Sequence, residues 1–168
     1  PTAIMGVRGT HFFAGVDFVT GVTQLSVAGG VVAAQEMNES GQPGDITLVY
    51  PSQEAYIAPG TPATFHQTVT NLTIFDPTSF VSNIDPGIIV AMMNQYQQIK
   101  SENDKMIESF RTDGVPEAVG TSPEDLERLN QNLSLLIPAI VKQAVEKGTI
   151  TQNDADQWVN QVQQQTGE

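Results

Sequence analysis

The composition of the chain changes once, near Asp85-Pro86, and this change constrains the fold more than any other feature of the sequence. Before it, the chain is weakly charged and rich in β-branched side chains, with eleven threonines from Thr2 to Thr78. Such a segment, interrupted by Gly and Pro, is typical of strands joined by turns. After it, helix start signals and helical periodicity dominate. We therefore expect an α+β chain, with an all-β domain at 1–85 and a helical region at 86–168.

Charge and composition exclude several classes of partner. The 168 residues carry 7 basic and 19 acidic side chains, which is a formal net charge of −12. A protein of that charge repels phosphate groups, so we expect no nucleic-acid partner. The longest purely apolar stretch, 88–93, is far shorter than the ~20 residues of a membrane span, so we expect no membrane insertion. The chain has no cysteine, which excludes disulfides, thiol catalysis and cysteine-ligated zinc.

Alternating side chains predict strands in the first domain. Leu25 and Val27 share one face of a strand, while Gln24 and Ser26 face the other way. The pair Gly29-Gly30 that follows is a strong turn signal. The expected strands are Thr10–Phe18, Thr23–Val27, Val31–Met37, Ile46–Tyr50 and Glu54–Ala58.

The segment Thr64–Phe75 is long and rich in threonine, with apolar residues on both faces. Its composition predicts an extended conformation. Two interpretations are open: an edge strand of its own domain, or an arm that pairs with a strand outside that domain.

A long helix is predicted at 86–111, with Asp85 as its N-cap and Pro86 as its first residue. Apolar residues then recur at spacings of 3 and 4, as at the a and d positions of a coiled coil, with one asparagine among them. Two interpretations are open: an amphipathic helix packed on its own domain, or a seam between chains whose register the asparagine fixes. The stripe consists of Ile89, Met92, Tyr96, Ile99, Asn103, Met106 and Phe110.

A helical hairpin is predicted at 123–165. Ser122-Pro123-Glu124-Asp125 is a helix start signal for its first helix, and Thr151 with Asp154 is one for its second. Pro138 lies inside the first helix and is expected to kink or split it, because the proline ring clashes with the preceding turn.

A glycine-rich motif, Gly6-Val7-Arg8-Gly9-Thr10, lies near the start of the chain, inside the stretch PTAIMGVRGTHF. It is followed by the segments Thr23–Val32 and Asp45–Gly60, each with turn glycines beside strand-forming residues. Over residues 1–60 these features resemble the FecR-domain family, in which a similar signature precedes a hairpin and two closing strands.

The resemblance implies an extracytoplasmic β-domain, built as a short β-helix or twisted sandwich, in the bacterial envelope. The best-known members of the family relay signals from an outer-membrane transporter to a sigma factor. Their signature lies midway through the domain, whereas here it lies at the start, so the resemblance implies missing strands and an unpaired sheet edge. An unpaired edge invites a further strand.

Arg8 is the only basic residue before Lys100, and two glycines flank the Val7-Arg8 pair. Glycines allow close backbone approach on both sides of this long side chain. We expect the guanidinium to bind a neighbouring acid or a set of carbonyls and so tie strands together; a site for an anionic ligand is the second interpretation. Gly6, Arg8, Gly9 and Thr10 are therefore candidate structural or interaction residues.

The sequence has no pattern of an enzyme or a cofactor site. His11 and His66 lie in separate strand candidates, and their spacing is not that of metal ligands. The sequence contains no Gly-x-Ser-x-Gly motif and no glycine-rich phosphate loop before a helix. We expect no catalytic residue, no cofactor and no metal.

These observations predict a non-enzymatic structural or adhesive subunit that is secreted or periplasmic. It is expected to assemble with copies of itself into a filament or surface polymer, by β-strand addition and by helix packing. The alternative is a periplasmic sensor or adaptor, similar to FecR proteins, that binds another envelope protein through the same edge. A glycan-binding module has little support, because Trp158 lies on an apolar helix face rather than in an exposed position.

Overall fold

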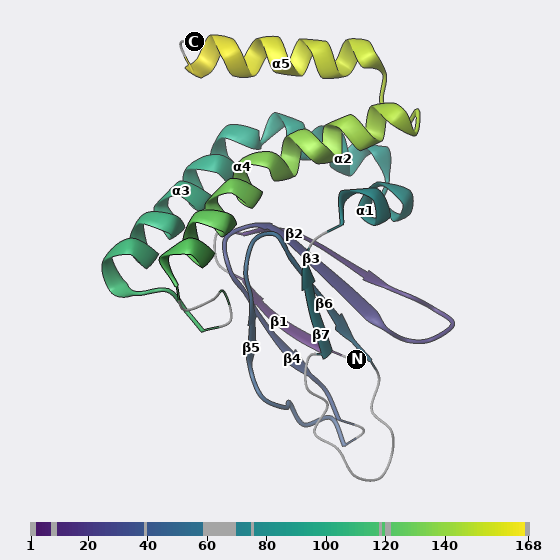
Figure 1. Ribbon diagram of the computed structural model, residues 1–168. Coiled ribbons are helices and arrows are strands. Elements are labelled where there is room, and N and C mark those ends of the chain that lie inside the picture. Colours follow the sequence, from purple (N-terminus) through teal and green to yellow (C-terminus); the bar gives the residue numbers. More distant parts are fainter. Residues whose placement is uncertain are drawn as a thin grey trace.

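The computed structural model describes residues 3–7, 10–38, 40–58, 70–74, 76–117, 119 and 122–166. In these residues seven strands precede five helices, so the expected α+β order of the chain is confirmed. Figure 1 shows the strands at one end of the molecule and the helices at the other. The strands are β1 (Ala3–Val7), β2 (His11–Val16), β3 (Thr23–Gly29), β4 (Val32–Glu36), β5 (Thr47–Val49), β6 (Gln53–Ile57) and β7 (Thr70–Ile74). The helices are α1 (Pro77–Asn83), α2 (Pro86–Asn94), α3 (Tyr96–Asp113), α4 (Pro123–Glu146) and α5 (Gln152–Thr166).

Two antiparallel sheets pack face to face. The first has the strand order β1-β4-β5 and the second has the order β2-β3-β6-β7, so the chain changes sheet after β1, after β3 and after β5. Burying an apolar side chain of this size stabilises a fold by about 1.5–3 kcal/mol. The side chains buried between the sheets come from both of them and are Leu25, Val27, Val32, Ala34, Val49, Ala55 and Ile57.

Strand β3 is buried on both of its faces. Leu25 and Val27 point into the space between the sheets and are 0% exposed, which confirms the alternation expected from the sequence. On the opposite face, Ser26 and Ala28 are 1% and 4% exposed. Ala28 packs in a second cluster that the helices mainly form. The second sheet is therefore the middle layer between the first sheet and the helices.

Helix α3 docks on the end of β3. The side chain of Asn103 is 5% exposed and donates a hydrogen bond from Nδ2 to the Ala28 carbonyl at 3.0 Å. Ile99, one turn earlier, is 2% exposed. A Cβ built on Gly29 would lie only 3.2 Å from Ile99 Cγ2, so the absence of a side chain at Gly29 allows this close approach.

The structure has two helices where the sequence predicted one at 86–111. Helix α2 ends at Asn94 and α3 begins at Tyr96, with Gln95 between them. The carbonyl of Met93 accepts a hydrogen bond from Trp158 Nε1 of α5 at 3.1 Å. The Tyr96 ring packs edge-on against the same indole, with ring centroids 5.3 Å apart. The break between α2 and α3 thus lies where the Trp158 side chain of α5 contacts both helices.

Helical structure also begins earlier than expected, because α1 lies inside the range 1–85 that was assigned to the β-domain. Asp76 is the N-cap of α1 and accepts a hydrogen bond from the Thr78 amide at 2.9 Å, and Pro77 is the first helical residue. Asp85-Pro86 starts α2 in the same way, as predicted. The sequence contains the Asp76-Pro77 helix start signal, but we assigned the whole range 1–85 to the β-domain and predicted no helix there.

The other helix signals fall where they were predicted. Ser122 and Asp125 form a reciprocal capping box at the start of α4, and Thr151 bonds to Asp154 at the start of α5. Pro138 lies inside α4, which continues to Glu146 and is not split. Among the described helices, none is both long and apolar enough to cross a bilayer.

Part of the Thr64–Phe75 segment is strand β7. It pairs antiparallel with β6 at the edge of the second sheet, as in the edge-strand interpretation. Residues 64–69 and 75 lie outside the described residues.

The docking of α3 can be tested at Asn103. We expect Asn103→Ala to lower the free energy of unfolding by about 1–2 kcal/mol, because the buried Ala28 carbonyl would lose its side-chain donor. Chemical denaturation measures this value. Asn160→Ala, at an exposed position of α5, is the control and should change the free energy by less than about 0.5 kcal/mol. Equal effects of the two substitutions would contradict a specific role of the Asn103 bond.

Candidate functional site

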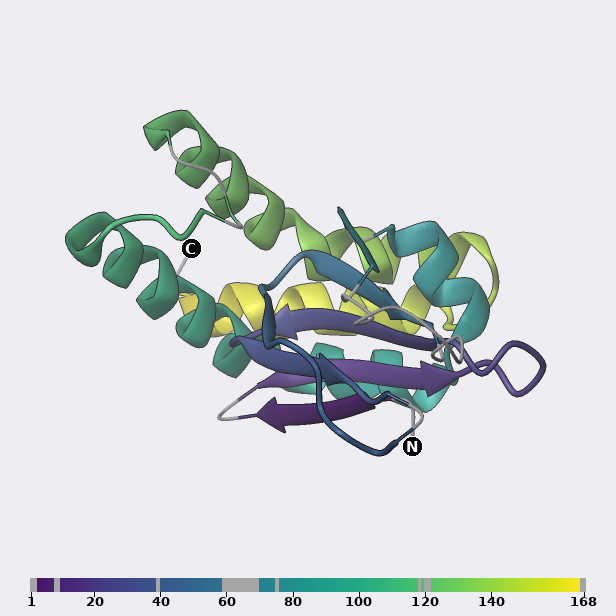
Figure 2. The ribbon, with the colours of Figure 1, turned by 90° about the horizontal axis from the view of Figure 1, so that it is seen from below.

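Strands β1 and β2 form an open side of the two sheets. β1 is one edge strand of the first sheet and β2 is one edge strand of the second, and Figure 2 shows the two strands side by side. In the part of the chain that the structure describes, no strand pairs with the outer edge of either one. Edge strands carry unpaired N–H and C=O groups that can bind a further strand.

Apolar side chains are exposed along this open side. Phe12 and Ala14 lie opposite Val27 and Leu25 in the β2–β3 ladder, so they share the face that forms the interior between the sheets. Phe12 is nevertheless 39% exposed and Val16 is 49% exposed, whereas Leu25 and Val27 are 0% exposed. The covered interior therefore ends at β2, and its last apolar side chains contact water.

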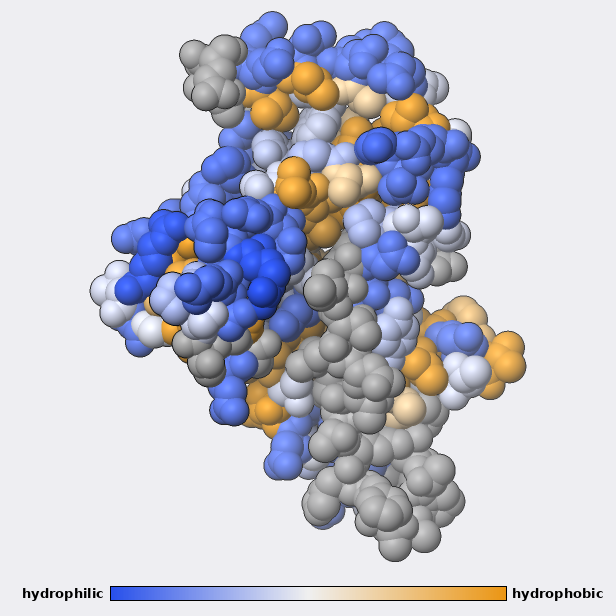
Figure 3. Space-filling model, viewed as in Figure 1, coloured by the Kyte–Doolittle hydropathy of each residue, from blue (hydrophilic) through white to orange (hydrophobic). Residues whose placement is uncertain are grey.

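The tip of the β2–β3 hairpin presents two more apolar side chains, since Phe18 is 100% and Val19 is 95% exposed. The turn itself is hydrogen-bonded: Asp17 Oδ1 accepts from the amides of Val19 at 2.8 Å and Thr20 at 3.0 Å. These amides lower the pKa of the Asp17 carboxyl, that of Thr20 most strongly. The tip projects from the molecule, and its hydrophobic atoms are orange on the right of Figure 3. We call Phe12, Ala14, Val16, Phe18 and Val19 the hairpin surface.

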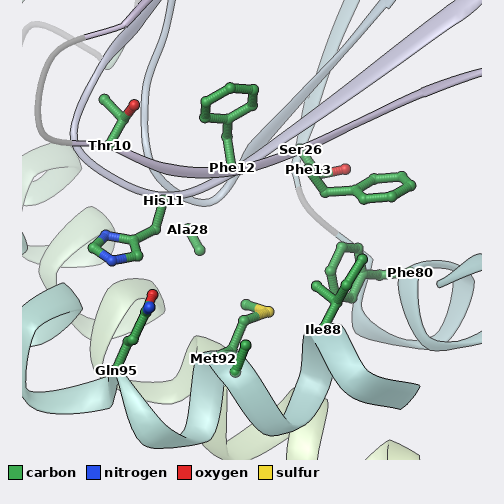
Figure 4. Close-up of a pocket in the computed structure, with 11 residues that line it drawn as sticks. Thr10, His11, Phe12, Phe13, Ser26, Ala28, Phe80, Ile88, Met92 and Gln95 are labelled. Carbon is green, nitrogen blue, oxygen red and sulfur yellow. The ribbon is translucent and has the colours of Figure 1, made fainter. Parts of the chain in front are cut away.

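A cavity of about 260 Å³ lies where strands β2 and β3 meet helices α1 and α2. Figure 4 shows Phe13, Phe80 and Ile88 together at one end of it. Phe13 and Phe80 are in edge-to-face contact, with ring centroids 5.9 Å apart and an interplanar angle of 88°. Met92 of α2 lies between this end and the opposite one, where His11 and Gln95 are found. The cavity is thus apolar at one end and polar at the other.

His11 is held by a carboxylate. Its Nδ1 lies 3.1 Å from Glu102 Oε2 of α3, and both side chains are partly buried, at 17% and 23% exposure. An ionised carboxylate can only accept, so Nδ1 carries the hydrogen in this pair. Gln98 donates to the other carboxylate oxygen at 3.1 Å and fixes its orientation. His66 lies outside the described residues.

A second carboxylate, Glu54, lies on the face of the second sheet that is turned away from the first. It is 2% exposed and accepts hydrogen bonds from Ser26 Oγ at 2.9 Å, Gln24 Nε2 at 3.3 Å and the Tyr56 hydroxyl at 3.3 Å. Burial raises the pKa of Tyr56, and the charge of Glu54 raises it further. Glu54 thereby links β3 and β6 through side chains.

These polar groups do not form a nucleophilic site. Ser26 lines the cavity but donates its hydroxyl hydrogen to Glu54, and it is 1% exposed. His11, which would have to act as the base, lies at the opposite end of the cavity and binds a different glutamate, Glu102 (Figure 4). An activated serine needs direct contact with its base, so this geometry does not support acyl transfer. In the described ranges no three His, Asp or Glu side chains are grouped for a metal ion.

A third buried carboxylate has no hydrogen-bond partner. Glu36 of β4 lies on the same face as Val32 and Ala34 and is 1% exposed, and both of its carboxylate oxygens lack a partner in the described part of the chain. It lies directly over the backbone of Gly44, where a Cβ would overlap the carboxylate. Leaving a buried polar group unsatisfied costs about 1–3 kcal/mol.

The glycine-rich motif is only partly described. Gly6 is in β1, where it pairs with Ala33, and Thr10 lines the cavity with a buried hydroxyl that has no partner among the described residues. Arg8 and Gly9 lie outside the described residues, so the structure does not test the role expected of the arginine.

The residues of the predicted helix stripe pack against other parts of the same chain. They divide between the cluster around the end of β3 and a smaller cluster between α3 and α4. Phe110 also packs edge-on against Tyr50, with ring centroids 5.8 Å apart. Of the two interpretations, the structure has an amphipathic helix packed on its own chain. The first cluster receives Ile89, Met92, Tyr96 and Ile99, the second receives Met106 and Phe110, and Asn103 binds β3.

Several residues of the site were missed in the sequence. Phe18 was placed at the end of the predicted strand Thr10–Phe18, whereas in the structure Phe18 and Val19 are both in the exposed tip of the β2–β3 hairpin. Two bulky apolar residues directly before Thr20-Gly21 are the signal that could have marked this tip. The pairings of His11 with Glu102 and of Ser26 with Glu54 join residues 91 and 28 positions apart. Local spacing contains no signal for such contacts.

The comparisons with known proteins assign no family to the chain. No family model, no curated protein and no solved structure matches it. The resemblance to the FecR-domain family stays a prediction.

The two fully buried glutamates of the β-domain should respond in opposite ways to replacement by methionine. Glu36→Met removes a carboxyl that has no hydrogen-bond partner among the described residues and should raise the free energy of unfolding by about 1–3 kcal/mol. Glu54→Met removes the acceptor of three donors and should lower it by at least about 1–3 kcal/mol. Denaturation at neutral pH measures both values. Destabilisation by Glu36→Met would show that its carboxyl has a favourable interaction after all.

The turn at the hairpin tip should loosen in acid. The folded-state pKa of Asp17 lies below its ordinary value of 3.8, so its bonds to the turn amides stabilise the tip above that value and are lost as the pH falls through the lowered pKa. Amide hydrogen exchange at Val19 and Thr20 should accelerate there beyond its normal pH dependence. In Asp17→Ala, amide exchange at Val19 and Thr20 should be fast already at neutral pH. Asp45→Ala, at an exposed position, is the control and should leave amide exchange at the tip unchanged.

Proposed function

We propose that this chain is a non-enzymatic, extracytoplasmic structural subunit that assembles with further copies of itself through the open side formed by β1 and β2. The observation that carries the proposal is the exposure of Phe12 and Val16, which belong to the inner face of the two sheets yet contact water beside unpaired strands. Apolar side chains in such a position are stabilised when a further strand covers them.

The edge strands lack most of the features that normally prevent edge-to-edge association. Natural sheets protect their edges with charged side chains, prolines or bulges. β1 (AIMGV), β2 (HFFAGV) and β7 (TNLTI) contain no charged residue and no proline, although the β2–β3 register has an irregularity between His11 and Phe12. Within the described residues, no further strand pairs with either edge of the second sheet, β2 or β7.

A second copy of the chain is a suitable partner for these edges. In an antiparallel pair of two β2 strands, each strand meets an identical uncharged one, so no like charges lie opposite each other. Pairing at the β7 edge as well would join successive copies into one continuous sheet. The β2–β2 contact alone has two-fold symmetry and closes as a dimer, whereas a second contact at β7 links successive dimers into an open polymer.

The hairpin surface would supply apolar area to the interface. Complete burial of one aromatic side chain removes about 150–250 Å² from water, and a stable interface buries roughly 1,200–2,000 Å² in total. Phe12 and Phe18 therefore contribute a part, and the paired strands supply the rest. The helix stripe that was expected to add helix packing is occupied inside the chain, so the proposal depends on the sheet edges alone.

The experiment compares two double variants that add the same charge. Phe12→Lys with Val16→Lys places two cations on the open side, whereas Ile46→Lys with Leu48→Lys places them at exposed positions in and beside β5. Sedimentation and negative-stain electron microscopy are recorded over a concentration series, and circular dichroism verifies the fold. We expect polymers of the unmodified chain and of the control, and at least about a tenfold weaker association of the edge variant, which corresponds to ~1.4 kcal/mol per contact.

Salt provides a second readout. Each copy carries a net charge of −12, so copies repel one another at low ionic strength and should assemble more readily when salt screens this repulsion. A monodisperse monomer of the unmodified chain at every concentration and salt would refute self-assembly. A monomer that captures a single envelope protein through the same edge would favour the alternative, a periplasmic adaptor similar to FecR proteins.

A further inference from the structure

The cavity between the second sheet and α2 has a volume of about 260 Å³ and opens to solvent, since Phe12 and Ile88 in its wall are 39% and 37% exposed. A dry cavity of about 150 Å³ is enough to bind benzene, so on the same scale this one would hold roughly ten non-hydrogen atoms. It is formed by four elements that join at one place, and its walls do not depend on a single loop.

The walls of the apolar end are fixed by ring packing. Phe13 of β2 and Phe80 of α1 contact each other edge-to-face and are both anchored in the helical cluster. Ile88 of α2 completes this end, and Met92 of α2 lies between it and the polar end, as Figure 4 shows. An aromatic or alkyl group placed here would contact ring edges, a thioether and methyl groups, which favours apolar ligands.

The polar end provides hydrogen-bonding groups without a positive charge from lysine or arginine. Glu102 accepts from Nδ1 of His11, so Nε2 is the ring nitrogen left for a ligand, and in a neutral imidazole with this tautomer it is an acceptor. The Gln95 side chain is exposed and lies at the same end, where its amide can donate or accept (Figure 4). Among the described residues, no lysine or arginine lines the cavity, and the carboxylate of Glu102 beside His11 disfavours an anion.

We infer that this cavity is a binding site for an uncharged, mainly apolar molecule of about ten non-hydrogen atoms that carries one hydroxyl group, such as a fused-ring phenol. The ring system occupies the end formed by Phe13, Phe80 and Ile88. The hydroxyl group donates to His11 Nε2 and accepts from the Gln95 amide. A site that combines apolar walls with a few polar groups at one end is the usual form of a small-molecule site. The inference does not depend on self-assembly of the chain.

The test uses three probes that differ in one group. 2-Naphthol carries the hydroxyl, naphthalene lacks it, and 2-naphthoate replaces it with a carboxylate. Binding is followed by isothermal titration calorimetry where solubility allows and by amide chemical shifts for all three. We expect one saturable site, shifts confined to β2, α1 and α2, and an order of affinity in which 2-naphthol exceeds naphthalene and naphthalene exceeds 2-naphthoate.

Two variants assign the binding to this cavity. Ala91→Phe introduces a ring at an exposed position of α2 that lines the cavity, and it should weaken 2-naphthol binding at least about tenfold. Val159→Phe adds the same ring at an exposed position of α5 and should leave binding unchanged.

Gln95→Met keeps the length of the side chain but removes its amide. It should weaken the binding of 2-naphthol about fivefold, which corresponds to the loss of one neutral hydrogen bond, and leave the binding of naphthalene unchanged. Gln131→Met on α4 is its control.

Three results would overturn the inference. Absence of saturable binding of any probe would show that the cavity does not accept ligands of this class. Equal affinity of Ala91→Phe and of the unmodified chain would place the ligand elsewhere. Tighter binding of 2-naphthoate than of 2-naphthol would show that the polar end selects an anion. If Ala91→Phe does not fold, Gln95→Met still tests the inference.

Discussion

Strand β3 is the element on which both halves of the molecule depend. Leu25 and Val27 on one of its faces hold the two sheets together, and Ala28 on the other belongs to the helical cluster. Asn103 connects these layers with a single buried hydrogen bond to the Ala28 carbonyl. The strand thus lies in the middle layer of the molecule. Its backbone is hydrogen-bonded to both neighbouring strands, and the side chains on each of its faces pack against a different layer. Helices and sheets share one continuous arrangement of buried contacts, although the sequence divides cleanly into a β part and an α part.

The two sides of the second sheet differ because the helices cover only its outer face. Phe13 points to the helices and packs on Phe80, whereas Phe12, the next residue back along the strand, points to the inner face and stays 39% exposed. The cavity and the open side are therefore consequences of the same strand: β2 has no neighbour beyond it within the described residues, and α2 does not fill the space over its outer face. A single edge strand provides both candidate surfaces.

Local signals in the sequence predicted much of the fold, and long-range contacts account for what they missed. The positions of β3, β4 and β6 and the starts of α2, α4 and α5 follow from alternation and capping residues such as Asp85 and Ser122. The break at Gln95 has no local signal in the sequence, and the Trp158 side chain that packs at this point lies 65 positions from the Met93 carbonyl that it binds. The same reason applies to the site: neither the glutamate that binds His11 nor the uncovered state of Phe12 has a local pattern.

The contact between Glu36 and Gly44 has a consequence for how this sequence can change over evolutionary time. A Cβ at position 44 would overlap the Glu36 carboxylate, which is the end of a flexible side chain, so the glutamate has to turn aside before alanine fits there. A shorter side chain at position 36 removes the overlap without any such movement. The two positions are therefore expected to covary among natural relatives.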